Sequence, residues 1–181
     1  VIHLSSKNLN DLLDNLLNWS RLQMNKIVPD PQIFELESVI NSNLDFLDSN
    51  MKQKRIHLLT TNLKDVFVKA DADMISVIIR NLLSNAIKFT NDNGNIHISV
   101  TPENEYIVLS IKDSGIGIPK DKIDDIFNIE TTTTTKGTNN EVGTGLGLIL
   151  CQDFAKLNKG RLRVSSVSGE GSDFKLYLLK P

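Results

Sequence analysis

The chain has 181 residues, of which 40% are hydrophobic and 23% are charged, and its formal net charge is −2. This length suits one compact domain with an extra element, and the hydrophobic content excludes a disordered chain. The nearly balanced charge argues against nucleic acid as the main partner. No apolar run approaches the ~20 residues of a membrane-spanning helix, so we expect no membrane segment here.

The single cysteine, Cys151, excludes an internal disulfide and fits a reducing, cytoplasmic compartment. We expect its side chain to be a small apolar part of the core rather than a reactive thiol. The chain begins at Val1 within a helical pattern and without Met, so we expect it to come from a longer parent protein.

The first predicted element is a long amphipathic helix over residues 6–27. Leucines recur at helical spacing together with Trp19, and polar residues lie between them. A helix with such a wide apolar stripe needs helical partners. Because Pro29 and Pro31 interrupt the pattern, we place a boundary there, with residues 1–28 as one unit and residues 29–181 as a second domain.

Beyond the prolines the pattern becomes mixed. Strands are predicted over 33–36, 56–60, 66–69, 96–101, 106–112, 161–166 and 173–179, and helices over 39–51, 73–89, 120–126 and 146–157. Asp71 is a good N-cap for the helix that runs to Phe89. A threonine-rich loop occupies residues 128–141. Helices and antiparallel strands in this order predict an α+β two-layer sandwich.

Three polar residues share one face of the helix over residues 73–89. Asn81, Asn85 and Lys88 are spaced i, i+4 and i+7. Asparagine is unfavourable inside a helix because its amide competes for backbone hydrogen bonds. Amide carbonyls can ligate a hard cation such as Mg²⁺, and lysine can approach phosphate as a point charge. The alternative is a solvated polar face.

The first glycine-rich segment, residues 113–119, directly follows a predicted strand. Asp113 at the strand end can accept a hydrogen bond from an exocyclic amine such as that of adenine. Gly115 and Gly117 allow the backbone to approach a ligand closely. An ordinary turn is the alternative.

The second glycine-rich segment precedes the helix over residues 146–157. Gly143, Gly145 and Gly147 alternate with other residues just before its apolar run. The first N–H groups of a helix have no partners within the helix and lie at the positive end of its dipole, so such a turn is suited to phosphate. A plain loop is the alternative.

Taken together, these segments resemble the sequence boxes of sensor histidine kinases. Residues 81–90 resemble the N box, 113–119 the G1 box, 126–127 part of the F box and 143–148 the G2 box, in matching order and spacing. The resemblance covers residues 33–181. It implies the ATP-binding catalytic domain shared with gyrase, MutL and Hsp90-type ATPases (the Bergerat fold). In that family three helices back a mixed, mostly antiparallel sheet, and a lid, here about residues 128–145, covers the nucleotide.

The resemblance also implies roles for individual residues. Asn81 and Asn85 would hold Mg²⁺ at the triphosphate of ATP, and Lys88 would contact phosphate. Phe89 would pack near the adenine or serve as a core aromatic. In the first glycine-rich segment, Asp113 would accept a hydrogen bond from the adenine amine, and Gly115 and Gly117 would lie beside the adenine. In the second, the phosphates would be contacted by Gly143, Thr144, Gly145, Leu146 and Gly147.

The chain departs from the family pattern in its F box. The family usually has a second aromatic and a basic residue soon after the first phenylalanine, whereas Ile129, Glu130 and a run of threonines follow here. Lys136 is the candidate for the missing cation of the lid. Asn81 and Lys136 are therefore the candidates for supporting the transition state, and no residue of the chain is assigned as catalytic.

The activity that the resemblance implies is that of a bacterial protein histidine kinase in a two-component phosphorelay. The helix over residues 6–27 resembles the second helix of the dimerisation and phosphotransfer hairpin, whose acceptor histidine lies on the first helix. His3, His57 and His97 do not stand in the acceptor pattern, so the acceptor is expected outside this chain. The implied partners are a response regulator receiver domain and, in the parent, a second copy. The implied location is cytoplasmic, with anchoring of the parent in the inner membrane left open.

Two other functions remain open. ATP hydrolases and clamps of the superfamily carry a glutamate one helical turn before the Mg²⁺-binding asparagine, where this chain has Asn81. An amide cannot act as a general base, so Asn81 favours histidine phosphorylation, and we expect negligible ATP hydrolysis. The third reading, a non-catalytic interaction module that has lost its nucleotide, is disfavoured because all nucleotide motifs are present.

Overall fold

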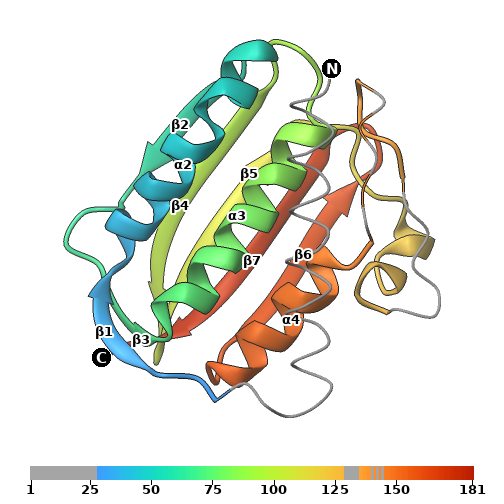
Figure 1. Cartoon of the computed structure of the whole chain (residues 1–181). Helices are drawn as coiled ribbons and strands as arrows, with labels where there is room; N and C mark the ends of the chain where they lie inside the picture. The colour runs from blue at the N-terminus through green and yellow to red at the C-terminus, as the bar shows by residue number, and fades with distance from the viewer. Residues whose placement is uncertain (1–27, 129–134, 140, 142, 144) are drawn as a thin grey trace.

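The structure is a computed structural model that describes residues 28–128, 135–139, 141, 143 and 145–181. It confirms the predicted two-layer sandwich: helices α2 (Leu36–Gln53), α3 (Ala72–Phe89) and α4 (Gly147–Leu157) lie on one face of a five-stranded sheet (Figure 1). The helix predicted over residues 6–27 lies outside the described residues, and the domain boundary near Pro29 stays a prediction.

The sheet is mixed and mostly antiparallel, with the strand order β2-β4-β5-β7-β6. Its strands are β2 (His57–Thr61), β4 (Asn95–Glu103), β5 (Tyr106–Asp113), β6 (Arg161–Val167) and β7 (Gly171–Leu179). Strand β2 runs parallel to β4, and the other neighbours are antiparallel. The β4–β5 and β6–β7 pairs are the two predicted hairpins.

A second, two-stranded sheet joins β1 (Gln32–Glu35) to β3 (Phe67–Ala70) in antiparallel register. The sequence places β2 and β3 next to one another, yet the structure puts them in different sheets. Leu36, predicted as the last residue of a strand, instead begins α2 and is fully buried, because the chain turns here from the small sheet into the core.

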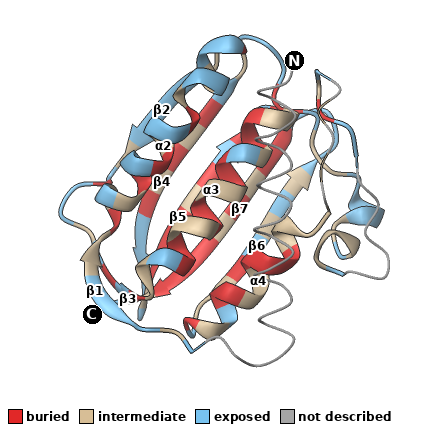
Figure 2. Cartoon of the chain, viewed as in Figure 1, coloured by how far each residue is buried: buried red, intermediate tan, exposed pale blue. Residues whose placement is uncertain are grey.

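Helix α3 lies at the centre of the molecule. Its fully buried residues, among them Ile75, Ile78 and Ile79, recur at helical spacing and belong to one hydrophobic core with sheet residues such as Leu109. Figure 2 shows the buried stretches along α3. The predicted N-cap is confirmed, because the Asp71 carboxylate accepts a hydrogen bond from Met74 N at 3.0 Å. The core therefore fixes α3, and with it the polar face that carries the two asparagines.

The short helix predicted over residues 120–126 is not one continuous helix. The structure has two short 3₁₀ helices there, η1 (Lys120–Lys122) and η2 (Asp125–Phe127). Within this segment only Ile126 and Phe127 pack on the core, which is too little apolar surface to hold a longer helix.

Candidate functional site

The site begins on the polar face of α3, where the structure brings Asn81 to the start of α4. Asn81 Nδ2 donates to Val77 O at 2.9 Å, which turns its carbonyl oxygen away from its own helix. A Cβ on Gly147, the first residue of α4, would lie only 2.6 Å from Asn81 Oδ1. Gly147 therefore leaves the room that this amide oxygen occupies. Asn85, one turn further along α3, is half-buried.

Lys88 stands near the C-terminal end of α3 and reaches the loop that precedes α4. Its ammonium donates to Thr135 O at 3.1 Å and lies over the Phe89 ring, 4.6 Å from the centroid. A Cβ on Gly143 would lie 2.7 Å from Lys88 Nζ. Burial lowers the pKa of Lys88, while the nearby Glu141 carboxylate acts in the opposite direction. A cation thus lies beside the glycine-rich turn, as a phosphate site requires.

Asp113 ends strand β5 and is almost completely buried, with 5% of its surface exposed. Its Oδ1 accepts hydrogen bonds from Gly115 N at 2.8 Å and Ser172 N at 3.3 Å. Burial raises the pKa of Asp113, and these backbone bonds only partly offset the rise. Within the described part of the chain no group donates to Oδ2, which leaves one oxygen of a buried carboxylate for a ligand donor.

The turn after Asp113 is held by backbone. Ile116 N donates to Phe89 O at 3.1 Å, and a Cβ on Gly115 would lie 2.3 Å from that same carbonyl oxygen. Gly117 has φ +66°, and a Cβ there would lie 2.0 Å from Val167 O. We expected these glycines to admit a ligand; the space beside both is filled by the protein's own backbone, so they fix the turn against α3 and β6.

The glycine-rich segment before α4 is described in part. Gly145 has φ +75°, a conformation that favours glycine, and Leu146 directly precedes the helix. The first helical hydrogen bond runs from Leu150 N to Leu146 O at 3.0 Å. A helix start directs backbone N–H groups outward, and here they lie beside Asn81. Thr144 lies outside the described residues, so its role stays a prediction.

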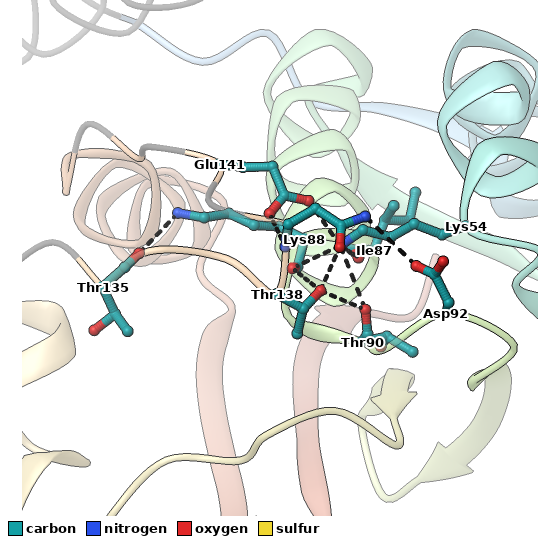
Figure 3. A network of polar contacts seen from close by, with 9 residues as sticks. Lys54, Ile87, Lys88, Thr90, Asp92, Thr135, Thr138 and Glu141 are labelled. Carbon is teal, nitrogen blue, oxygen red and sulfur yellow. Dashed lines mark hydrogen bonds and ion pairs between the residues drawn. The ribbon is translucent and has the colours of Figure 1, made fainter.

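The structure also shows polar residues that the sequence analysis missed. Lys54, Thr138 and Glu141 form a network at the end of α3 (Figure 3). A lysine at a helix end is ordinarily exposed, so no sequence signal marks Lys54 as buried. By contrast Lys136, the predicted cation of the lid, is exposed and makes no hydrogen bond or ion pair with the described residues.

Further features of the described residues concern metal-ligand clusters, the cysteine and membrane-spanning helices. Across the described residues no group of three or more His, Cys, Asp or Glu side chains converges as a metal site. Cys151 is fully buried and burial raises the pKa of its thiol, which confirms its structural role. No helix in the described ranges is long and apolar enough to cross a bilayer.

Comparison with known proteins agrees with this geometry. Residues 70–181, more than half of the chain, match the family of histidine kinase-, DNA gyrase B- and HSP90-like ATPases. The chain is 30% identical over 182 residues to the circadian input-output histidine kinase CikA of Synechococcus elongatus, covering 98% of this chain and 24% of CikA. The chain spans about a quarter of the length of the curated relatives it matches.

Solved structures give the same result. The catalytic domain of histidine kinase ThkA has a TM-score of 0.71 and 27% identity, covering 83% of this chain and 96% of that one. The complex of ThkA with the response regulator protein TrrA, at 22% identity and a TM-score of 0.77, covers 99% of this chain and 49% of that one and shows the shared fold. The chain therefore belongs to the histidine kinase-, DNA gyrase B- and HSP90-like ATPase family, as an ATP-binding catalytic domain of the sensor histidine kinase type.

Proposed function

We propose that this chain binds Mg²⁺-ATP and transfers the γ-phosphoryl group to a histidine that lies outside it, as the first step of a two-component phosphorelay. The observation that carries the proposal is the meeting of Asn81 with Gly147, which places an amide oxygen of α3 beside the helix start that suits phosphate. Phosphoryl transfer needs mainly positioning and charge neutralisation, which the helix start, Lys88 and a Mg²⁺ ion on the amides would provide.

The adenine and the phosphates of the nucleotide would bind in two different parts of the site. Asp113 Oδ2 would accept the exocyclic amine of adenine, since Oδ1 is already held by backbone N–H groups. Lys88 and the segment with Gly143, Gly145 and Gly147 would contact the phosphates, with Thr144 and Leu146 in the same segment. The Phe89 ring lies under the Lys88 ammonium and would pack near the adenine.

The residues present fit Mg²⁺. Asn81 offers its oxygen, because its Nδ2 donates to Val77 O, and Asn85 follows on the same face of α3. Mg²⁺ prefers oxygen ligands and keeps several from water and phosphate, so two amides suffice on the protein side. When bound, the ion would neutralise charge on the phosphate oxygens. The chain's own part is to orient these two amides.

Histidine phosphorylation is favoured over hydrolysis by Asn81, which stands at the position where hydrolases of the superfamily carry a glutamate. Asn81 cannot remove a proton from water. The Glu141 carboxylate lies near Lys88 but forms an ion pair with Lys54 Nζ at 2.7 Å and accepts from Asn139 N at 2.8 Å. Its pKa is lowered, because these bonds outweigh the effect of burial, so it is a poor proton acceptor.

The acceptor and the partners would be supplied by the rest of the parent. His57 and His97 lie on β2 and β4, and the His97 ring is hydrogen-bonded to Thr61 Oγ1 at 2.9 Å, so neither serves the site. A homodimeric parent with the acceptor on its phosphotransfer hairpin, and a response regulator receiver domain as the next acceptor, are the proposed partners. ThkA was solved with its response regulator TrrA, which supports the second partner.

The test separates the three functions. The chain is incubated with Mg²⁺ and radiolabelled ATP, with and without a separately made phosphotransfer hairpin of the parent. We expect acid-labile phosphate on the hairpin and almost no release of inorganic phosphate without it. Rapid release without the hairpin would make the chain a hydrolase, and an absence of ATP binding in calorimetry would make it an interaction module.

A further inference from the structure

A buried lysine lies behind the phosphate side of the site. Lys54, at the C-terminal end of α2, is only 4% exposed. Its ammonium is surrounded by oxygen atoms from two other segments (Figure 3): Ile87 O at 3.0 Å, Lys88 O at 2.9 Å, Thr90 O at 3.4 Å, Thr138 Oγ1 at 2.7 Å and Glu141 Oε1 at 2.7 Å. A buried ammonium is costly without partners, and this one has a full set.

Lys54 connects the end of α3 to a closed turn of the loop before α4. The turn is closed by a hydrogen bond from Gly137 N to Glu141 O at 2.9 Å. It is attached to the end of α3 by a second bond, from Thr138 N to Lys88 O at 3.1 Å. A Cβ on Gly137 would lie 2.3 Å from Glu141 Oε2, so the turn closes tightly over this carboxylate. The turn therefore depends on both the ion pair and the helix end.

The Glu141 carboxylate that pairs with Lys54 also lies near Lys88. One Glu141 oxygen is bound by Lys54 and the other by Asn139 N. The Lys88 side chain extends away from this carboxylate, and its ammonium donates to the uncharged carbonyl of Thr135 (Figure 3). A phosphate displaces a neutral carbonyl from an ammonium more easily than it displaces a carboxylate, because charge-assisted bonds are the stronger ones.

We propose that Lys54 is a positioning residue for phosphate binding: it holds the Glu141 carboxylate away from the Lys88 ammonium and keeps the turn with Gly137 and Thr138 on the end of α3. Lys54 itself touches no nucleotide in this arrangement. The inference rests on the proposed function, because it assigns to Lys88 the contact with the phosphates of ATP.

The first experiment is Lys54→Met, which keeps the length of the side chain and removes its charge. We expect the Kd for Mg²⁺-ATP in calorimetry to rise about tenfold, because the released carboxylate pairs with Lys88 through a charge-assisted bond. Lys52→Met is the matched control: Lys52 is exposed and pairs with Asp48 on the surface at 2.7 Å, so its loss leaves the Kd unchanged.

The double variant Lys54→Met/Glu141→Gln distinguishes positioning from packing. If Lys54 acts by restraining the carboxylate, removing the charge of Glu141 restores most of the lost affinity. If Lys54 only supports the fold, the second substitution restores nothing. Wild-type affinity in Lys54→Met, or a double variant as weak as the single one, would overturn the proposal.

A second readout covers the case in which Lys54→Met does not fold. Lys136 is exposed and directly precedes the turn, so trypsin cleavage after it reports on the turn. We expect Glu141→Gln to speed this cleavage several-fold and Lys52→Met to leave it as in the wild type; an unchanged rate in Glu141→Gln overturns the proposal. Failure of the wild type to bind ATP would instead refute the proposed function, and the cleavage rates would still decide whether Lys54 holds the turn.

Discussion

The contact between Asp113 and adenine can be tested with one isosteric substitution, Asp113→Asn. The asparagine carbonyl can keep the two bonds that Oδ1 now accepts, from Gly115 N and Ser172 N. Its amide nitrogen then takes the place of Oδ2, where the ligand amine is expected. A donor would face a donor, so the substitution removes the proposed contact and leaves the turn intact.

The size of the effect follows from the kind of bond that is lost. A hydrogen bond to a charged group contributes about 1.5–3 kcal/mol, so Mg²⁺-ATP should bind roughly 10- to 150-fold more weakly. Asp113 is only 5% exposed, so a water molecule cannot easily replace the lost contact with the ligand. The expected loss of affinity therefore lies in the upper half of that range.

Asp113→Asn should weaken ATP binding without lowering the free energy of unfolding. Burial raises the pKa of Asp113 above its ordinary 3.8, so as the pH rises through that value the unfolded chain loses its proton before the folded one does. The ionised carboxylate therefore opposes folding at pH values above its pKa in the unfolded chain, and the opposition is complete above its raised pKa. At neutral pH we expect Asp113→Asn to have a free energy of unfolding equal to or above that of the wild type.

Calorimetry with Mg²⁺-ATP and urea unfolding at pH 7 measure the two quantities on the same protein. Asp121→Asn, an exposed carboxyl in η1, is the matched control and should change neither. Wild-type affinity in Asp113→Asn would refute the adenine contact. A variant that loses ATP binding together with several kcal/mol of stability would show that Asp113 is mainly structural.

Three further predictions concern the rest of the molecule. Gly147→Ala would place a Cβ 2.6 Å from Asn81 Oδ1, so calorimetry should show the Mg²⁺-dependent part of ATP affinity lost, and equal affinity would contradict the Asn81 site. Burial lowers the pKa of Lys88 below its ordinary 10.5, so ATP affinity should fall in the alkaline range as its proton is lost, and a Lys88→Met variant that keeps this fall would contradict the assignment. Leu109→Ala, at a fully buried position, should lower the free energy of unfolding by about 2–5 kcal/mol in urea, and a smaller loss would mean that the core refills the space.

Much of the fold could be predicted from the sequence because its signals are local. The helix after Asp71 is marked by its cap and by a buried stripe with helical period, and both hairpins by alternation around short turns. The pairing of β2 with β4 in parallel, and of β3 with β1, could not be predicted in this way. Those contacts join segments far apart in the chain, and no local pattern encodes which strands meet.

The candidate site shows the same limit. Asn81, Asp113 and Gly147 stand in motifs, so the sequence singles them out as a set. Lys54 does not, because its burial results from the end of α2 packing on the end of α3, a tertiary contact. Gly117 stands in a motif, but no local pattern indicates that the backbone of Val167 lies where its Cβ would be.

The two halves of the site differ in how they are held, and this has a consequence for selectivity. Asp113 is fixed by backbone bonds between β5, the turn after it and β7, all of which rest on the core. The Lys88 ammonium donates to a loop carbonyl, at Thr135, and the Glu141 carboxylate favours its charged form while the Lys54 ammonium opposes it. Changes to the ion pair should therefore alter the affinity for the phosphates and leave the affinity for adenosine unchanged. Titrating ATP and adenosine side by side into Glu141→Gln and Lys54→Met tests this separation, because a parallel loss for both ligands would mean that the halves are coupled through the fold.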